Sequence, residues 1–202
     1  MPLWLAAAPL VLASQSKVRR AVLEAAGIPV EARPAHLDER AIEQQVTSGK
    51  PGDVALTLAR EKARTVAAMS EARLVVGCDQ TLALGERRFS KPADRRAARE
   101  QLMAMRGKTH ELHSGIAVVR GGALVFGHVA VARMTMRDFS ESFLEAYLDE
   151  AGVNVTASVG AYQLERTGIH LFERIEGDHF TILGLPLLPL LDYLRGEGAL
   201  SA

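Results

Sequence analysis

The chain has 202 residues, the size of one ordinary domain or of two small lobes. Hydrophobic residues make up 48% and charged residues 24%, a composition typical of a globular protein with a sizeable core and not of a disordered chain. The formal net charge is zero, which argues against electrostatic capture of DNA, RNA or an acidic membrane. The single cysteine, Cys78, excludes an internal disulfide and fits a reducing cytoplasm.

The first apolar run, residues 3–13, does not resemble a signal peptide or a membrane helix. No Lys or Arg precedes it, Pro9 interrupts it, and it is far shorter than the roughly 20 residues that a membrane helix needs. We interpret it as a buried strand that ends in a turn, in a cytoplasmic protein without a membrane segment.

Along the rest of the chain, strand and helix patterns alternate, and Gly and Pro mark their boundaries. The patterns predict strands at residues 10–13, 30–33, 74–78, 112–119, 123–136, 169–175 and 180–183. They predict helices at residues 16–26, 53–69, 94–105 and 140–151 and from 186 onward, with Asp53 as the N-cap of the second. A hairpin at Gly121 and Gly122 interrupts the alternation, so we expect an α/β fold with a mixed sheet and helices on its faces.

The turn after the first strand carries the first candidate site. Ser14 and Ser16 precede a helix that carries Arg19 in its first turn. A helix N-terminus presents free N–H groups and a partial positive charge that suit an anion. The alternative is that one serine only caps the helix.

Lys62 is the second candidate. It lies within a stripe of apolar residues at helical spacing (Ala55, Leu58, Ala59, Val66 and Met69). A lysine among core-facing positions must extend its amine to solvent, pair with an acid or meet an anion in a cleft.

Acidic residues supply the third candidate. Asp79 directly follows a buried strand, and ligands of α/β sheets gather at the carboxyl ends of strands. An acid there can hold a metal or act as a base, although a turn aspartate is a common alternative. Asp38 and Glu39 form a further acidic pair that could equally be a solvated loop, and Lys91 could be a surface lysine.

Other residues give weaker signals. His110 and His113 alternate on one strand without the spacing of a metal site, so we interpret them as histidines on a sheet surface, and Cys78 as inert core. Glu165 lies in a glycine-bounded loop, where it could read a base edge or simply be exposed. The combination of cations, acids and a helix N-terminus favours phosphoryl chemistry with a divalent ion.

With these residues in place, the sequence resembles the Maf family of nucleoside triphosphate pyrophosphatases over nearly its whole length. The likeness is carried in order by LASQS at 12–16 with Arg19, DE at 38–39, EKA at 61–63, GCDQ at 77–80, KP at 91–92, GKTH at 107–110, GAY at 160–162, EGD at 176–178 and GLPL at 184–187. Lys17 stands where the family usually has Pro, and Ser90 where it usually has Gly.

The resemblance implies an elongated, ITPase-like α/β domain over residues 1–202 with a cleft between two lobes, often a homodimer. It implies hydrolysis of a nucleoside triphosphate to monophosphate and pyrophosphate with Mg²⁺ or Mn²⁺, as in the clearance of modified nucleotides. By matching positions, Asp79 is the proton acceptor. The other matched positions are Lys62, Lys91 and Arg19 as phosphate contacts, Ser14 as the hydroxyl of the turn, and Glu39 with Asp79 as acids that hold the metal.

The base preference rests on few positions. Gln80, Glu165 and LFER at 171–174 resemble the subgroup that acts on 7-methyl-GTP, and a carboxylate at 165 can accept hydrogen bonds from a guanine edge. The pair Ala161 and Tyr162 is closer to the subgroup that acts on dTTP and UTP. Two other functions stay open: a nucleotide-binding regulator of cell division with little turnover, and a nucleic-acid or division-machinery adaptor, against which the neutral charge counts.

Overall fold

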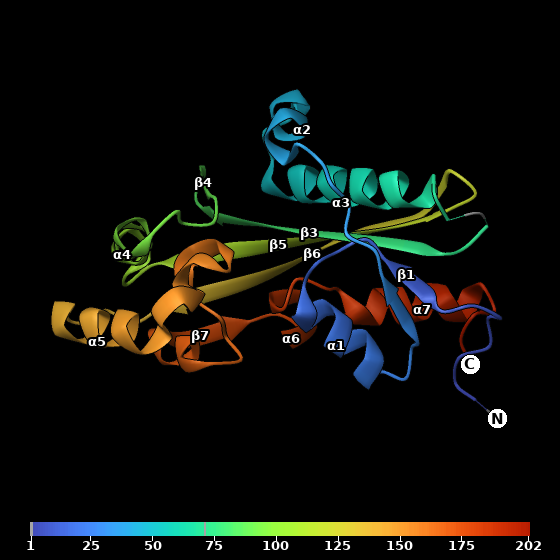
Figure 1. The fold of residues 1–202 in the computed structure, drawn as a ribbon. Coiled ribbons are helices and arrows are strands. Elements are labelled where there is room, and N and C mark those ends of the chain that lie inside the picture. The colour runs from blue at the N-terminus through green and yellow to red at the C-terminus, as the bar shows by residue number, and fades with distance from the viewer. Residues whose placement is uncertain (1, 71) are drawn as a thin grey trace. The chain divides into compact units, whose positions relative to one another are not determined.

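The computed structural model describes residues 2–70 and 72–202 and shows a mixed α/β fold (Figure 1). In this part of the chain, seven strands form one sheet in the order β2-β1-β3-β5-β6-β7, with β4 paired to β3 outside this path. Strand β1 pairs in parallel with β2 and β3, whereas the β3–β4 and β6–β7 pairs are antiparallel. The predicted mixed sheet is therefore confirmed.

The strands are β1 (Leu10–Leu12), β2 (Val30–Ala32), β3 (Val75–Leu84), β4 (Arg87–Phe89), β5 (Thr109–Arg120), β6 (Ala123–Met136) and β7 (Phe172–Glu176). The α-helices are α1 (Lys17–Ala25), α2 (Glu39–Gln45), α3 (Pro51–Ala67), α4 (Arg95–Met105), α5 (Glu141–Ala151), α6 (His179–Ile182) and α7 (Leu187–Gly196). Three 3₁₀ segments, η1 (Gly152–Thr156), η2 (Val159–Ala161) and η3 (Thr167–Leu171), follow α5. No helix in these described ranges is long and apolar enough to cross a membrane.

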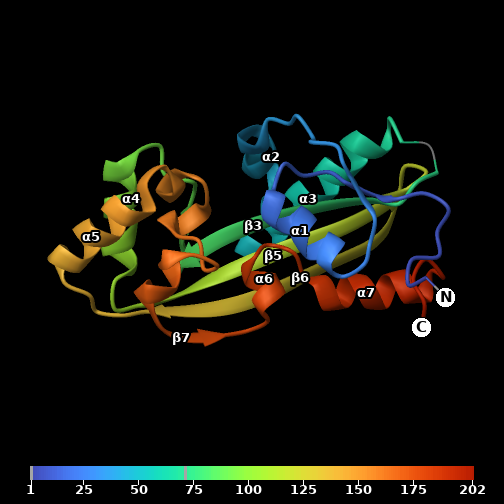
Figure 2. The ribbon, with the colours of Figure 1, turned by 60° about the horizontal axis from the view of Figure 1, so that its bottom comes forward.

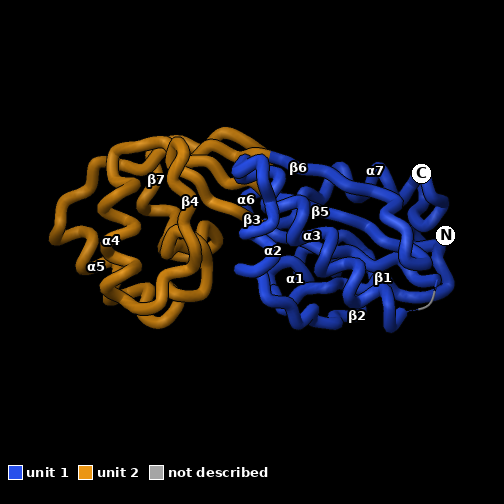
Figure 3. Tube along the Cα trace, turned by 90° about the horizontal axis from the view of Figure 1, so that it is seen from above, with its two compact units in different colours: residues 1–79, 114–130, 179–202 blue, residues 80–113, 131–178 orange. Residues whose placement is uncertain are grey.

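Tertiary contacts divide the chain into two compact units (Figure 3). Unit 1 comprises residues 1–79, 114–130 and 179–202, and unit 2 comprises residues 80–113 and 131–178. Strands β3, β5 and β6 each begin in one unit and end in the other. Each unit is therefore assembled from segments that are far apart in the sequence.

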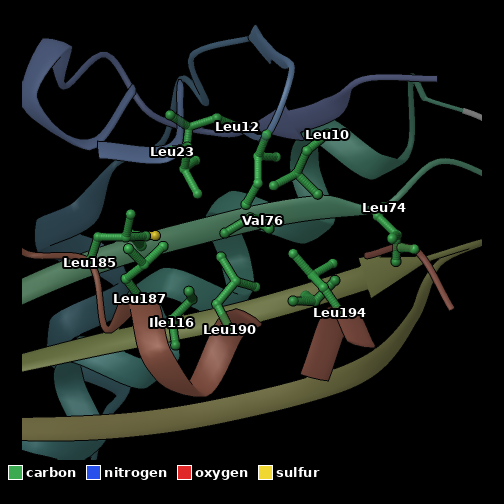
Figure 4. Close-up of a cluster of buried hydrophobic side chains, with 14 of the residues drawn as sticks. Leu10, Leu12, Leu23, Leu74, Val76, Ile116, Leu185, Leu187, Leu190 and Leu194 are labelled. Carbon is green, nitrogen blue, oxygen red and sulfur yellow. The ribbon is translucent and has the colours of Figure 1, made fainter. Parts of the chain in front are cut away.

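In unit 1, helix α3 covers one face of the sheet, and α1 and α7 cover the other (Figures 1 and 2). Side chains alternate along β1 as they must on a strand: Leu10 and Leu12 join the core cluster with α1 and α7, and Val11 joins the cluster with α3. Figure 4 shows the first cluster, in which leucines of β1, α1 and α7 meet around Val76. Burial on both faces explains the continuous apolar run, which is typical of parallel strands.

Helix α3 lies unusually close to the sheet because glycines of two neighbouring strands face it. A Cβ on Gly77 of β3 would lie 2.0 Å from the carbonyl oxygen of Ala59, and one on Gly115 of β5 would lie 2.5 Å from the carbonyl carbon of Ala55. Either methyl group would collide with the helix backbone. These two positions therefore set the distance between α3 and the strands beneath it.

Replacing Gly77 by alanine should destabilise the protein by about 2 kcal/mol or more, because overpacking a well-filled core costs about 1–3 kcal/mol and here backbone must move. Gly127→Ala is the matched control, since a Cβ there would meet only side chains at ordinary contact distances, Leu56 at 3.5 Å and Arg60 at 3.7 Å. Urea unfolding of both variants measures the difference. Equal stability of the two variants would contradict this account of the close approach.

In unit 2, helices α4 and α5 contact each other and the 3₁₀ segments. Arg99 of α4 binds Glu141 and Glu145 of α5, with nitrogen–oxygen distances of 2.7 Å to each. On β5, His110 is completely buried, and its Nε2 lies 2.8 Å from the hydroxyl oxygen of Tyr162. The prediction of a surface histidine was wrong at His110, because it lies on the face of β5 that packs against Tyr162 and Phe172.

Several predicted elements differ from the structure. Residues 180–183, predicted as a strand, lie in helix α6 and the turn after it, and β7 begins only at Phe172 because a 3₁₀ segment takes up residues 167–171. The predicted N-cap Asp53 lies inside α3, whose N-cap is Lys50. Met69, placed by its spacing among core residues, follows the end of α3 and is 69% exposed. Of the apolar run 3–13, residues 10–13 are buried, whereas Leu3 and Leu5 are exposed.

Burial makes His110 a source of acid sensitivity. It lowers the pKa of His110 to about 4, so the unfolded chain, with a histidine pKa near 6.5, takes up the proton first as the pH falls. Above pH 6.5 the difference between the two pKa values does not reduce the free energy of unfolding. As the pH falls from 6.5 to 4, protonation of the unfolded chain lowers this free energy progressively. Between pH 7 and pH 5 the loss amounts to about 2 kcal/mol.

The His110→Phe variant should lack this part of the pH dependence. The measurement is the free energy of unfolding at pH 7 and pH 5 for the wild type, His110→Phe and the control His36→Phe, which changes an exposed histidine. The difference between the two pH values should shrink by about 2 kcal/mol in the first variant alone. An unchanged pH dependence in His110→Phe would refute the role of this histidine.

Candidate functional site

The centre of the candidate site is an ion pair between α3 and β3. Val75 and Gly77 face α3, and the alternation of side chains along β3 directs Asp79 to the same side. The Lys62 Nζ atom lies 2.6 Å from Oδ1 of Asp79, and only 12% and 13% of the two side chains are exposed. The lysine singled out in the apolar stripe thus pairs with Asp79. The prediction that Asp79 follows the end of its strand was wrong, because β3 continues to Leu84 and Asp79 lies inside it.

Glu39 completes this cluster from a third element. Helix α2 begins at Glu39 because the Asp38 side chain accepts a hydrogen bond from the backbone N–H of Ala41 and caps the helix. The Lys62 Nζ atom lies 2.8 Å from Oε1 of Glu39, whose side chain is half exposed. The acidic pair at 38–39 is therefore a helix start that presents one carboxylate to the lysine and not a solvated loop.

Burial and charge act in opposite directions on this pair. Burial raises the pKa of Asp79 above its ordinary value, although the neighbouring charges of Lys62 and Arg19 pull it down. Burial would also lower the pKa of Lys62, but Asp79 and Glu39 outweigh it and raise that pKa. The lysine therefore stays charged, and Asp79 is a stronger base than an exposed aspartate.

Ser14 and Arg19 lie at the turn that follows β1. Ser16 is the N-cap of α1 and accepts from the backbone N–H of Arg19, so the capping alternative holds for Ser16. Ser14 accepts from the backbone N–H of Ser16 at 3.2 Å and from Nη1 of Arg19 at 3.3 Å. Nη1 of Arg19 also donates to the carbonyl oxygen of Cys78 at 2.8 Å, which ties this turn to the residue before Asp79.

The Arg19 guanidinium has donor capacity to spare. Its Nε is buried without a hydrogen-bond partner among the described residues. A Cβ on Gly184 would lie 2.9 Å from Nη2, so the glycine leaves the room that the guanidinium occupies. The sequence alone did not show this role of Gly184, which only the fold reveals.

Cys78 lies in the core, as predicted. It is a free thiol that is completely buried in the core cluster shared with α1 and α7. Burial raises the pKa of the Cys78 thiol to about 11, so the nucleophilic thiolate is scarce at neutral pH.

The remaining predicted residues belong to unit 2. Gln80 follows Asp79 on β3, Lys91 lies exposed in the loop after β4, and Glu165 lies exposed between η2 and η3. Their roles stay predictions from the resemblance. The structure thus brings together Ser14, Arg19, Glu39, Lys62 and Asp79, all within unit 1.

The carboxylates present suit a magnesium or manganese ion whose coordination is completed by the substrate. Hard divalent cations prefer oxygen ligands, and Mg²⁺ commonly binds one or two carboxylates together with phosphates and water. Asp79 and Glu39 offer such a pair of carboxylates, because both contact the ammonium of Lys62. In the described ranges no group of three or more His, Cys, Asp or Glu residues could hold an ion by itself, so phosphate would have to complete the coordination.

Comparison with known proteins identifies the family. The sequence model of the Maf-like protein family matches residues 9–197. The chain belongs to the Maf-like family. A relative from Rhodopseudomonas palustris CGA009, named nucleoside triphosphate pyrophosphatase, is 57% identical over 100% of both chains. A relative from Rhizobium meliloti, named 7-methyl-GTP pyrophosphatase, is 51% identical over 96% of this chain and 98% of its own.

These findings confirm the resemblance seen in the sequence and the assignment to the hydrolases. The solved structure of a HAM1 protein from Coxiella burnetii matches the fold of this Maf-like chain with a TM-score of 0.50 at 14% identity, and the match covers 93% of this chain and 98% of the other. That likeness concerns the fold alone.

Proposed function

We propose that this Maf-like chain hydrolyses nucleoside triphosphates between the α and β phosphates and releases a nucleoside monophosphate and pyrophosphate. The observation that carries the proposal is the nearly buried Lys62–Asp79 pair, which lies beside the Arg19 turn in the same unit. Nucleophile activation and phosphate binding need these two kinds of group side by side. The names of the relatives support the same reaction.

Asp79 serves as the proton acceptor. A water molecule that attacks the α-phosphorus must lose a proton, and the carboxylate of Asp79 takes it. Because burial raises the pKa of Asp79, this carboxylate is a better base at neutral pH than an exposed one. Its raised pKa and its place beside the Lys62 ammonium support Asp79 as the acceptor of this proton.

Lys62 and Arg19 neutralise phosphate charge. The ammonium of Lys62 supplies a mobile point charge, and the guanidinium of Arg19 supplies a fixed fork of donors with its buried Nε still unpartnered. Both stabilise the charge that develops on the departing pyrophosphate. The Ser14 hydroxyl offers a further donor at the same turn, and Lys91 is assigned to phosphate binding on the family resemblance.

Asp79 and Glu39 are the proposed ligands of Mg²⁺ or Mn²⁺. Such an ion, when bound, would act as a Lewis acid that polarises the phosphate. The chain itself holds these two carboxylates, Asp79 of β3 and Glu39 of α2, against the same Lys62 ammonium.

As the substrate we propose 7-methyl-GTP, and as the role the removal of modified nucleotides from the cellular nucleotide pool. Gln80 and Glu165 support this choice by the family resemblance, as does the name of the Rhizobium meliloti relative. The exposed carboxylate of Glu165 is free to accept hydrogen bonds from the amide and amine edge of guanine. The alternative is a pyrimidine triphosphate, UTP or dTTP.

The test is pyrophosphate release from a panel of nucleoside triphosphates, normal and methylated, with Mg²⁺ and with EDTA. The wild type should release pyrophosphate fastest from 7-methyl-GTP, and EDTA should abolish release. Asp79→Asn should lower kcat by about 100-fold or more, the range of a lost general base. Asp192→Asn, an exposed aspartate on α7, is the matched control and should retain wild-type activity.

Each contrary outcome has its own meaning. Full activity of a folded Asp79→Asn variant would remove Asp79 from the mechanism. Preference for UTP or dTTP would replace the proposed base by the pyrimidine alternative. Tight nucleotide binding without any product over hours would indicate a nucleotide-binding regulator instead of an enzyme.

A further inference from the structure

The Lys62 ammonium lies between two carboxylates that come from different elements. Its Nζ atom is 2.6 Å from Oδ1 of Asp79 on β3 and 2.8 Å from Oε1 of Glu39 on α2. Both distances are those of charge-assisted hydrogen bonds. The ammonium of Lys62 therefore occupies a position between the two acids at which a small cation could also bind.

We propose that Lys62 is a built-in competitor of the divalent cation, which must take Asp79 and Glu39 from the ammonium before it can bind. This inference rests on the proposed function, because it concerns the metal of that reaction. In the nucleotide-free protein the ammonium forms an ion pair with both carboxylates and reduces the electrostatic repulsion between them. The protein alone therefore binds the metal weakly.

A triphosphate changes this balance. Its oxygens offer the ammonium new acceptors, and the flexible four-carbon stem of lysine lets Nζ turn to them while its backbone on α3 stays in place. Each carboxylate oxygen that Lys62 leaves becomes available to the metal. Nucleotide and metal then bind with positive coupling, and the coupling is reciprocal by thermodynamic linkage.

The ammonium also explains why the pair of acids can exist without the metal. Glu39 is half exposed, but Asp79 is nearly buried, and an unpaired buried carboxylate is costly. Lys62 supplies the positive charge that stabilises it until substrate arrives. The same residue thus has one partner set before nucleotide binding and another one after it.

The experiment measures the affinity for Mn²⁺ alone, without nucleotide, from the free-ion electron paramagnetic resonance signal. Lys62→Met removes the ammonium and keeps the length of the side chain. It should bind Mn²⁺ at least about tenfold more tightly than the wild type, which corresponds to about 1.4 kcal/mol. The melting temperature of Lys62→Met should accordingly rise more on addition of Mn²⁺ than that of the wild type.

Three control variants distinguish the loss of the Lys62 ammonium from the two carboxylates from the general effect of removing a positive charge. Lys62→Arg keeps a cation on the carboxylates and should show no gain in Mn²⁺ affinity. Arg19→Met removes a nearby charge that contacts neither acid in the described structure, and should change the affinity by less than about threefold, because it leaves Lys62 on both carboxylates. The double variant Lys62→Met/Asp79→Asn should lose the gain, since one of the two ligands is missing.

An Mn²⁺ affinity of Lys62→Met equal to or below that of the wild type would overturn the inference, and so would an equal gain in Arg19→Met. Failure to detect Mn²⁺ binding to either protein at millimolar concentrations counts against it in the same way. None of these results depends on turnover. A wild type that hydrolyses triphosphates, together with a negative binding result, would therefore leave the proposed function intact.

Discussion

The structure depends above all on the charged contact between Lys62 and Asp79. Both side chains are nearly buried, and removing two charges from water is expensive unless their geometry is good. Here a 2.6 Å contact between Lys62 and Asp79 offsets part of that cost, and Glu39 gives the ammonium a second partner. The contact exists because Gly77 lets the backbone of α3 approach β3 closely, two residues before Asp79. Packing in the core and chemistry at the site are thus set by the same close approach.

Around this contact, unit 1 arranges its elements as the chemistry of phosphates requires. Strand β1 ends at Leu12, and the turn that follows carries Ser14 and leads into α1, while the parallel strand β3 continues to Asp79. Arg19 joins the two through Ser14 and the carbonyl oxygen of Cys78. Asp79 lies inside β3, which runs on to Leu84, and the parallel pairing of β1 with β3 places it next to the turn where β1 ends and α1 begins. The site therefore follows from the topology of the sheet.

Local signals in the sequence were sufficient where caps and periodicity agree. Ser16, Asp94 and Ser140 each cap the helix that the sequence predicts after them. Prediction failed where tertiary contacts decide. The apolar segment at 180–183 has the composition of a strand but folds into α6, because a short apolar run alone does not distinguish a strand from a buried helix.

The site was predictable to a different degree at each residue. Lys62 stood out physically, as a cation within an apolar stripe, and the structure gave it a partner. Glu39 gave a weaker signal, as one member of an acidic pair that could equally be a solvated loop, because α2 is short and has no buried residues; its role came from the family resemblance. The contributions of Gly77 and Gly184 could not be read from the sequence, since a glycine reveals what it makes room for only once its neighbours are known. The roles of Lys91, Gln80 and Glu165 stay predictions.

A double-mutant cycle on pyrophosphate release tests most directly whether Lys62 and Asp79 act as one unit. It compares kcat/KM of the wild type, the Lys62→Met and Asp79→Asn single variants and the double variant, each checked for its fold by circular dichroism. The account predicts strong non-additivity: the double variant should lose little more activity than the worse single variant, with a coupling energy of about 1.4 kcal/mol or more. Losses that simply add, with a coupling energy near zero, would contradict it.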